Sequence, residues 1–385
     1  MTCFGIDPFT GEHLAIEFET GFRVVDTLIA QPASGTPYIA PAWIDLQVNG
    51  YAGVDFNSPH ATPEEIRHAI AVLHSTGTAR FFPTVITGSP EDMEASLRNL
   101  WKARQQLGAE GEAIEGFHVE GPHISPEDGP RGAHPKRWVR PPDLEEYRRW
   151  QEATEGHIRL VTLSPEWPEA PRYIEQLVSE GVVVSIGHTQ ATSEQIAAAV
   201  SAGASLSTHL GNGAHRLLPR HPNYIWDQLA EDRLCAGFIV DGIHLPASFV
   251  RVALRAKGLS RSLLVTDASM PACAPPGIYR LGEQEVELTE DNRVVLRGQN
   301  RLAGSALRMN DAISNVIRMT GISLAEALSL ASRNPARVGR IVHRQRGLAP
   351  GERADFVLFD YDPQTHTIRI RETWLSGRRV FKASD

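Results

Sequence analysis

Short apolar segments alternate with longer amphipathic stretches from Ile44 onward, and this alternation determines the predicted fold. Eight apolar segments are expected to be strands, over residues 44–49, 79–87, 114–120, 158–164, 182–188, 205–210, 234–241 and 262–267. Strands that alternate with helices form a parallel sheet, because each connection crosses over the sheet. Eight such units predict an α/β fold, a (β/α)8 TIM-like barrel.

The segments between these strands carry signals for helix starts. Thr62 can cap a helix, Pro63 suits its first turn, and Glu65 completes a capping box. Residues 192–195 and 323–326 repeat this signal. Alternating Val and Leu between turn residues over 277–300 predict a hairpin inserted after the eighth strand, followed by two further helices.

The two chain ends predict a second, smaller domain. Residues 1–39 alternate apolar and polar positions between turn signals, which is typical of short antiparallel strands. Residues 354–359 form another strand-like run after the turn residues of 347–352, placed to return to the N-terminal strands. We therefore predict a small β-sandwich domain from residues 1–39 and 346–385, with the barrel over 40–345.

Composition and charge exclude several classes of protein. Of 385 residues, 42% are hydrophobic and 22% charged, which is typical of globular proteins and excludes disordered, collagen-like and coiled-coil chains. A net charge of −8 argues against nucleic acid or an anionic membrane as a partner. The three cysteines are far apart and odd in number, which argues against a disulfide framework. Without an export signal or a long apolar run, we expect a cytoplasmic protein.

Polar residues end several of the predicted strands, where the active site of a barrel lies. Glu120 ends the third strand, His188 the fifth, His209 the sixth and Asp267 the eighth. Carboxylate and imidazole groups from separate strand ends can converge on Zn²⁺ or another divalent metal. A single strand-end His is more often a structural residue, and Asp267 could instead cap a helix. Their occurrence together on one barrel favours a shared site.

The first strand ends in two amides, Gln47 and Asn49. Many barrel hydrolases hold a second metal with a His-x-His pair at this position. Neutral amides are poor ligands for zinc, so we expect one metal. Ordinary hydrogen bonding at the strand end is the alternative role for both side chains.

Several motifs together resemble those of the N-acetylglucosamine-6-phosphate deacetylases, members of the amidohydrolase superfamily. They are 44–50 (IDLQVNG), 118–122 (HVEGP), 187–189 (GHT), 208–210 (THL), 241–244 (DGIH) and 265–268 (VTDA). Residues 302–305 (LAGS) and 334–336 (NPA) are also similar to that family. The similarity runs in the same order along nearly the whole chain.

The resemblance implies one divalent metal ion per subunit, Zn²⁺ or alternatively Fe²⁺, Mn²⁺ or Co²⁺. It implies that Glu120, His188 and His209 hold this ion and that Asp267 is the general acid/base. It further implies a homodimer and a small-molecule amino sugar as substrate. The residues implied to bind this substrate are His134, Asn212, Gly213, His244 and Arg220, the last reaching the phosphate in the neighbouring subunit.

One loop departs from the family pattern. The family usually has Asn-Ala-Met and then Gly-Arg-Glu-Pro-Gly, whereas this chain has Asn-Gly-Ala-His at 212–215 and Pro-Arg-His-Pro-Asn at 219–223. Arg220 could therefore be a solvated surface residue instead. The segment between Glu120 and His134 is also slightly longer than usual, and no role is assigned to His123, His215 and His221.

The implied reaction is hydrolysis of the N-acetyl group of N-acetyl-D-glucosamine 6-phosphate, giving D-glucosamine 6-phosphate and acetate. An amide is a poor electrophile, and a metal with an open position can lower the pKa of water to about 7 and stabilise the oxyanion. Asp267 would move the proton from this water to the sugar nitrogen. The alternatives are an unphosphorylated or different N-acetyl sugar or another small amide, and a non-enzymatic interaction protein on the same fold.

Overall fold

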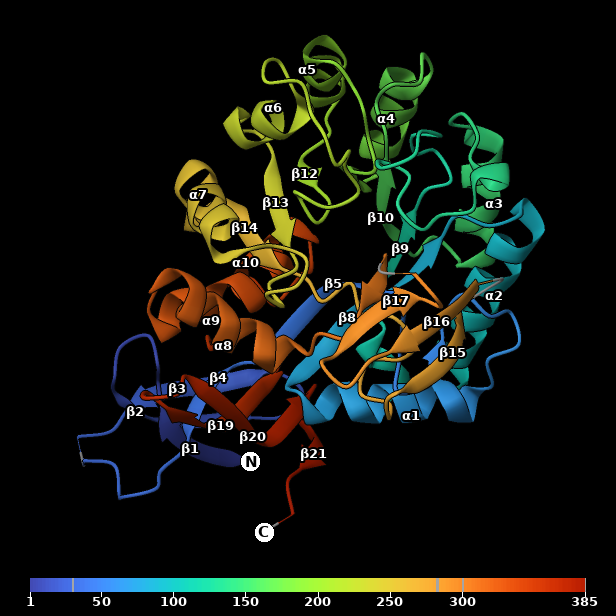
Figure 1. Ribbon diagram of the computed structural model, residues 1–385. Coiled ribbons are helices and arrows are strands. Elements are labelled where there is room, and N and C mark those ends of the chain that lie inside the picture. Colours follow the sequence, from blue (N-terminus) through green and yellow to red (C-terminus); the bar gives the residue numbers. More distant parts are fainter. Residues whose placement is uncertain (30, 282–283, 300, 385) are drawn as a thin grey trace.

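The largest sheet of the computed structural model, which describes residues 1–29, 31–281, 284–299 and 301–384, is the predicted barrel (Figure 1). Its neighbouring strands pair in parallel in the order β14-β13-β12-β11-β10-β9-β8-β5. The bounds are β5 (Trp43–Val48), β8 (Thr78–Ile86), β9 (Phe117–Glu120), β10 (Ile158–Leu163), β11 (Val183–Ile186), β12 (Leu206–Ser207), β13 (Cys235–Phe238) and β14 (Ser262–Leu264). The barrel class is confirmed.

Hydrogen bonds between residues 45–49 and 266–268 join the first barrel strand to the last. The Asp267 amide donates to the Gln47 carbonyl at 3.0 Å, and the Asn49 amide donates to the Ala268 carbonyl at 2.7 Å. The buried Asp45 carboxylate accepts from the Thr266 hydroxyl at 2.5 Å. This seam places the ends of β5 and β14 side by side.

Helices surround the barrel on its outside (Figure 1). Capping boxes at Thr62, Thr192 and Ser323 start three of them, as predicted. Within the described residues, no helix is both long and apolar enough to cross a membrane. The bounds are α1 (Pro63–Ser75), α2 (Pro90–Gln106), α3 (Leu144–Ala153), α4 (Ala170–Ser179), α5 (Ser193–Ser201), α6 (Tyr224–Ala230), α7 (Ala247–Lys257), α8 (Met309–Thr320), α9 (Leu324–Ala331) and α10 (Arg333–Val338).

The expectation of two helices after the inserted strands is wrong, because three follow. Ser332 leaves the helical conformation, with φ −131° and ψ −74°, and separates α9 from α10. Pro335 lies three residues further on. A proline ring clashes with the carbonyl four positions earlier in a continuous helix, so the chain breaks before it.

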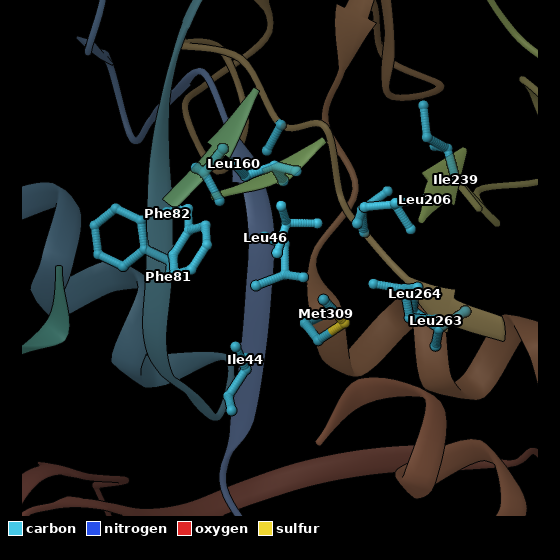
Figure 2. Packing of buried hydrophobic residues seen from close by; sticks show 14 of the residues in the cluster. Ile44, Leu46, Phe81, Phe82, Leu160, Leu206, Ile239, Leu263, Leu264 and Met309 are labelled. Carbon is cyan, nitrogen blue, oxygen red and sulfur yellow. The ribbon is translucent and has the colours of Figure 1, made fainter. Parts of the chain in front are cut away.

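Apolar side chains pack tightly around the barrel strands (Figure 2). Leu46 of β5 lies between Phe82 of β8 and Met309 of α8, and all three are at most 1% exposed. Burying a side chain of this size contributes about 1.5–3 kcal/mol. This core supports the strand ends that carry the polar residues.

A second sheet unites the two ends of the chain, which lie close together in Figure 1. Strand β19 pairs antiparallel with β4, with Phe356 opposite Pro41, as the return of the C-terminal strand predicts. The predicted boundaries between the two domains, after residues 39 and 345, stay a prediction. The strand order is β21 (Arg378–Lys382), β20 (Thr367–Leu375), β19 (Phe356–Asp362), β4 (Tyr38–Pro41), β1 (Thr2–Ile6), β2 (His13–Phe18) and β3 (Phe22–Thr27).

Buried ion pairs connect this sheet to the barrel. The Asp355 carboxylate lies 2.6 Å from Arg80 Nε and 3.0 Å from Arg344 Nε, and all three side chains are at most 3% exposed. Glu115 accepts from the same Arg80 at 2.8 Å. Buried charged side chains therefore join the two sheets.

The insertion after the last barrel strand is a four-stranded antiparallel sheet. It consists of β15 (Gly277–Leu281), β16 (Gln284–Leu288), β17 (Arg293–Leu296) and β18 (Leu302–Ser305). The insertion thus has two strands more than the predicted hairpin, and β18 lies beyond the predicted range of 277–300. Residues 282–283 and 300 lie outside the described part of the chain. Gln284 Nε2 donates to the Ala133 carbonyl at 3.1 Å, which ties the insertion to the loop after β9.

Candidate active site

A cavity of about 750 Å³ opens at the carboxyl ends of the barrel strands. The insertion forms one wall through β15, β16 and β18, and the segment 85–96 forms another. Of the residues singled out from the sequence, those that line the cavity are Asn49, Glu120, His134, His188, His209, Asn212, Gly213, His244 and Asp267. Strand ends far apart in the sequence therefore face one enclosed space.

Glu120, His188 and His209 form a tight cluster at the cavity floor. His188 Nε2 lies 3.2 Å from Glu120 Oε1, and His209 Nε2 lies 2.9 Å from the same oxygen. The two Nε2 atoms are 3.1 Å apart. His134 is also close, because its ligand atom lies within 4.8 Å of those of Glu120 and His188.

The chemistry of this cluster fits a divalent metal. His188 Nδ1 donates to the Pro130 carbonyl at 2.7 Å, so Nε2 is the ring nitrogen that faces His209 and Glu120. Burial opposes charge on Glu120, but His188 and His209 hold its pKa well below the usual range. An ionised carboxylate and two imidazole nitrogens within 3.2 Å of one another are a suitable ligand set for a divalent cation.

Backbone strain is concentrated at the same strand ends. His188, His209 and Asp267 have φ values of 49°, 28° and 49°, in the left-handed region that non-glycine residues rarely adopt. Such conformations cluster at functional sites, where the surrounding structure imposes them. They also explain why β11, β12 and β14 end earlier than predicted, since a positive φ interrupts extended backbone.

Asp267 faces the cavity beside Asn49, whose Nδ2 donates to Asp267 Oδ1 at 2.6 Å. Burial, reinforced by the Glu120 carboxylate, raises the pKa of Asp267 to about 6. The next element after Asp267 is strand β15, so a helix-capping role is excluded. A carboxylate with a pKa near neutrality is suited to taking up and releasing a proton.

His134 and His244 also line the cavity. His134 Nδ1 lies 2.8 Å from the Thr87 hydroxyl, and burial lowers the pKa of His134 to about 3, so its ring is neutral. His244 Nδ1 lies 2.6 Å from Asp241 Oδ2, which fixes its orientation. Asn212 Nδ2 donates to the His209 carbonyl at 3.3 Å.

Gly213 lies against the ring of His188 with φ 56°. A Cβ at this position would lie 2.7 Å from His188 Nδ1, which is too close. We expect Gly213→Ala to displace His188 and to lower zinc affinity by about 10–100-fold, as loss of a supporting contact does elsewhere. Competition with a chelator measures this affinity.

Gly181→Ala is the matched control for this prediction. Gly181 also has a positive φ, 86°, but a Cβ there would meet nothing within 4 Å. Both variants place a Cβ at a positive φ, and only one should disturb the metal site. Equal zinc affinity of the two variants would contradict the prediction.

Arg220 is not brought to the cavity of its own chain. It is exposed on the loop before α6 and lies outside the cavity lining. Among the lysines and arginines in the described part of the chain, only Arg280 of β15 lines the cavity. The sequence carried no signal for Arg280 or Thr87. Residues 302–304 of the family-like motif at 302–305 also line the cavity, although no position was predicted for them.

The three histidines without an assigned role lie outside the cavity lining. His123 is buried against Trp150 and Tyr173, and burial lowers its pKa to about 3. His215 Nδ1 lies 3.1 Å from the Tyr224 hydroxyl, and His221 is exposed. Their surroundings are those of structural or surface residues.

Comparisons with known proteins agree with this geometry. The profile of the Amidohydrolase family matches residues 303–381. N-acetylglucosamine-6-phosphate deacetylase of Bacillus subtilis (strain 168) is 33% identical over 326 residues, which cover 84% of this chain and 81% of the relative. N-acetylgalactosamine-6-phosphate deacetylase of Shewanella sp. (strain ANA-3) is 33% identical over 389 residues, with 97% and 93% covered.

A solved structure is similar over the same length. It is a point mutant of Mycobacterium smegmatis N-acetyl-D-glucosamine-6-phosphate deacetylase in complex with N-acetyl-D-glucosamine-6-phosphate. The identity is 29% and the TM-score 0.87, with 98% of this chain and 97% of that chain covered.

The barrel, the strand-end Glu–His–His cluster and the neighbouring carboxylate define a metal-dependent hydrolase of the amidohydrolase superfamily. Within it, the chain belongs to the N-acetylglucosamine-6-phosphate deacetylase family.

Proposed function

We propose that the protein hydrolyses the N-acetyl group of an amino sugar 6-phosphate, with N-acetyl-D-glucosamine 6-phosphate as the preferred substrate. The products are D-glucosamine 6-phosphate and acetate. The observation that carries this proposal is the convergence of Glu120, His188, His209 and Asp267 on one cavity. The relatives named for this substrate support the choice of sugar.

Glu120, His188 and His209 would hold the metal, and their nitrogen and oxygen donors suit Zn²⁺. When bound, such an ion polarises the acetyl carbonyl and makes a nearby water more acidic. Asp267 takes the proton from the attacking water and delivers it to the sugar nitrogen. A carbon–oxygen bond forms and the carbon–nitrogen bond breaks, so that acetate and the amine leave.

The remaining cavity residues would bind and orient the sugar. Thr87 can donate its hydroxyl hydrogen to His134 Nδ1, which leaves the neutral His134 with an Nε2–H donor for the acetyl oxygen or a sugar hydroxyl. His244 and Asn212 supply further polar groups to the same cavity. The backbone of Gly213 allows close approach beside His188.

The proposal includes a homodimer in which Arg220 reaches the phosphate bound in the neighbouring subunit. The loop that carries Arg220 also exposes Leu217, at 90%, and Trp226 of the adjoining helix is 50% exposed. Exposed large apolar residues around a cation suit an interface that delivers this cation to a partner. We also place the protein in the reducing cytoplasm, which agrees with its free cysteines.

Acetate release by the zinc-loaded protein tests the proposed function. N-acetylglucosamine 6-phosphate, N-acetylgalactosamine 6-phosphate and unphosphorylated N-acetylglucosamine are compared under identical conditions. We expect the first to be turned over fastest. Faster turnover of N-acetylgalactosamine 6-phosphate would mean that this sugar is the preferred substrate. If neither phosphorylated sugar is deacetylated, the proposal is overturned.

Arg220→Ala is expected to raise KM for the phosphorylated sugar about tenfold or more, because a charge-assisted pair with phosphate is lost. The rate with unphosphorylated N-acetylglucosamine should not change. Arg280→Ala is the comparison, since Arg280 lines the cavity from the same chain. If only the Arg280 variant loses affinity for phosphate, the assignment of Arg220 is wrong.

A further inference from the structure

Two amide side chains at the end of β5 each hold one of the two carboxylates of the site. Gln47 Nε2 donates to Glu120 Oε1 at 2.9 Å, and Asn49 Nδ2 donates to Asp267 Oδ1 at 2.6 Å. Gln47 lies in β5 and Asn49 follows its last residue, Val48, so both amides lie at the carboxyl end of this strand. Because an ionised carboxylate only accepts hydrogen bonds, each amide must present its nitrogen to it.

The backbone around Asn49 fixes its pairing with Asp267. The backbone N–H of Asn49 donates to the carbonyl of Ala268, and the backbone N–H of Asp267 donates to the carbonyl of Gln47. The Asn49 carbonyl in turn accepts from Asn57 Nδ2 at 3.2 Å. The side-chain amide of Asn49 therefore lies beside the Asp267 carboxylate with little freedom to move away from it.

The other end of the Asn49 amide has no partner among the described residues. Its Oδ1 atom is buried without a hydrogen-bond donor, although Asn49 lines the cavity. A buried acceptor left without a donor is costly, so such atoms are usually satisfied by a ligand or a water. A substrate nitrogen protonated by Asp267 has to approach the carboxylate to which this amide is bonded, and before cleavage it carries an N–H that Oδ1 could accept.

We propose that Asn49 binds at the reacting amide: Nδ2 orients Asp267, and Oδ1 accepts the acetamide N–H of the substrate. This inference rests on the proposed deacetylation. It gives Asn49 a role distinct from that of Gln47, which holds a metal ligand. The Asn49 amide therefore orients Asp267 and the scissile amide group, and the Gln47 amide supports the metal site.

Paired variants, Asn49→Ala and Gln47→Ala, test this division of roles. Gln47→Ala should weaken zinc binding by about 10–100-fold, whereas Asn49→Ala should leave it within about twofold of wild type. Asn49→Ala should instead raise the pKa of Asp267, because the hydrogen bond from Asn49 stabilises the ionised form. Glu120, His209 and His244 also act on this carboxylate and are unchanged in both variants.

Titration of the carboxyl carbon by ¹³C NMR, assigned with Asp267→Asn, measures that pKa without any substrate. A second readout uses a 2-O-acetyl ester analogue of the sugar phosphate, which lacks the N–H. Asn49→Ala should lower kcat/KM about tenfold more for the amide than for the ester, since one hydrogen bond is lost only with the amide.

The outcomes separate the inference from the proposed function. If wild type deacetylates the sugar but Asn49→Ala changes neither the pKa of Asp267 nor the amide-to-ester ratio, the role of Asn49 is wrong. If wild type releases no acetate from any N-acetyl amino sugar, the proposed function fails and with it the substrate contact. The NMR titration then still decides whether Asn49 controls Asp267.

Discussion

Asp267→Asn is expected to lower kcat by about 10²- to 10⁴-fold, the range that proton transfer by one side chain contributes to a rate. The variant has nearly the same shape and keeps the neighbouring Asn49, but it can no longer accept a proton. Its zinc content should equal that of wild type, because Glu120, His188 and His209 are unchanged. Single-turnover kinetics and metal analysis on the same preparation check both expectations.

The pH dependence of the rate gives a second test of Asp267. As the proposed general base, Asp267 must be ionised to take a proton from water, and burial with the Glu120 carboxylate raises its pKa to about 6. A bound cation nearby favours the ionised form and lowers this value. We therefore expect kcat/KM of wild type to fall as the pH decreases, with a midpoint at or below 6. The residual activity of Asp267→Asn should lack this decline, and near-normal activity of the variant would show that another group carries the proton.

Asp355→Ala is expected to lower the free energy of unfolding by about 3–5 kcal/mol, because it leaves the buried Arg344 without its counter-ion and the buried Arg80 with Glu115 alone. Arg80 and Arg344 both lie within 3.0 Å of the Asp355 carboxylate, and the Ser376 amide also donates to it at 2.6 Å. Urea denaturation measures the change. The matched control is Asp360→Ala, which breaks an exposed ion pair with Arg371 and should cost at most about 1 kcal/mol.

The Asp355 carboxylate should also make the free energy of unfolding depend on pH in the acidic range. Although burial opposes ionisation, Arg80 and Arg344 hold the pKa of Asp355 below its usual range. A lowered pKa contributes stability that is fully present above the unfolded-state value of about 3.9 and is lost as the pH falls through the folded-state value. Between pH 5 and pH 2, wild type should therefore lose more stability than Asp355→Asn. Parallel decreases in the two proteins would mean that this carboxylate is not the acid-sensitive group.

Residues at the strand ends were the most predictable part of the site. A parallel barrel brings the carboxyl ends of all its strands together, so Glu120, His188, His209 and Asp267 could be expected in one place before any contact was known. The apolar pattern also located all eight barrel strands. It overestimated their length at His209 and Asp267, because the pattern of side chains does not reveal a positive φ.

Contacts between distant parts of the chain could not be predicted in this way. Asp355 and Arg80 are 275 residues apart, and with 38 basic and 46 acidic residues the sequence allows many other pairings. The contact of Thr87 with His134 and the position of Arg280 likewise depend on how loops and the insertion pack. No local pattern of residues encodes these distances.

The seam between β5 and β14 joins parts of the site that lie far apart in the chain. The three proposed metal ligands end β9, or lie two residues beyond β11 and β12, all inside the run of neighbouring strands from β9 to β12. Asp267 and Asn49, in contrast, are separated by 218 residues and meet only when the first strand pairs with the last. The proposed ion site therefore draws its ligands from neighbouring strands, whereas the position of the proposed proton carrier depends on closure of the ring between the first and last strands.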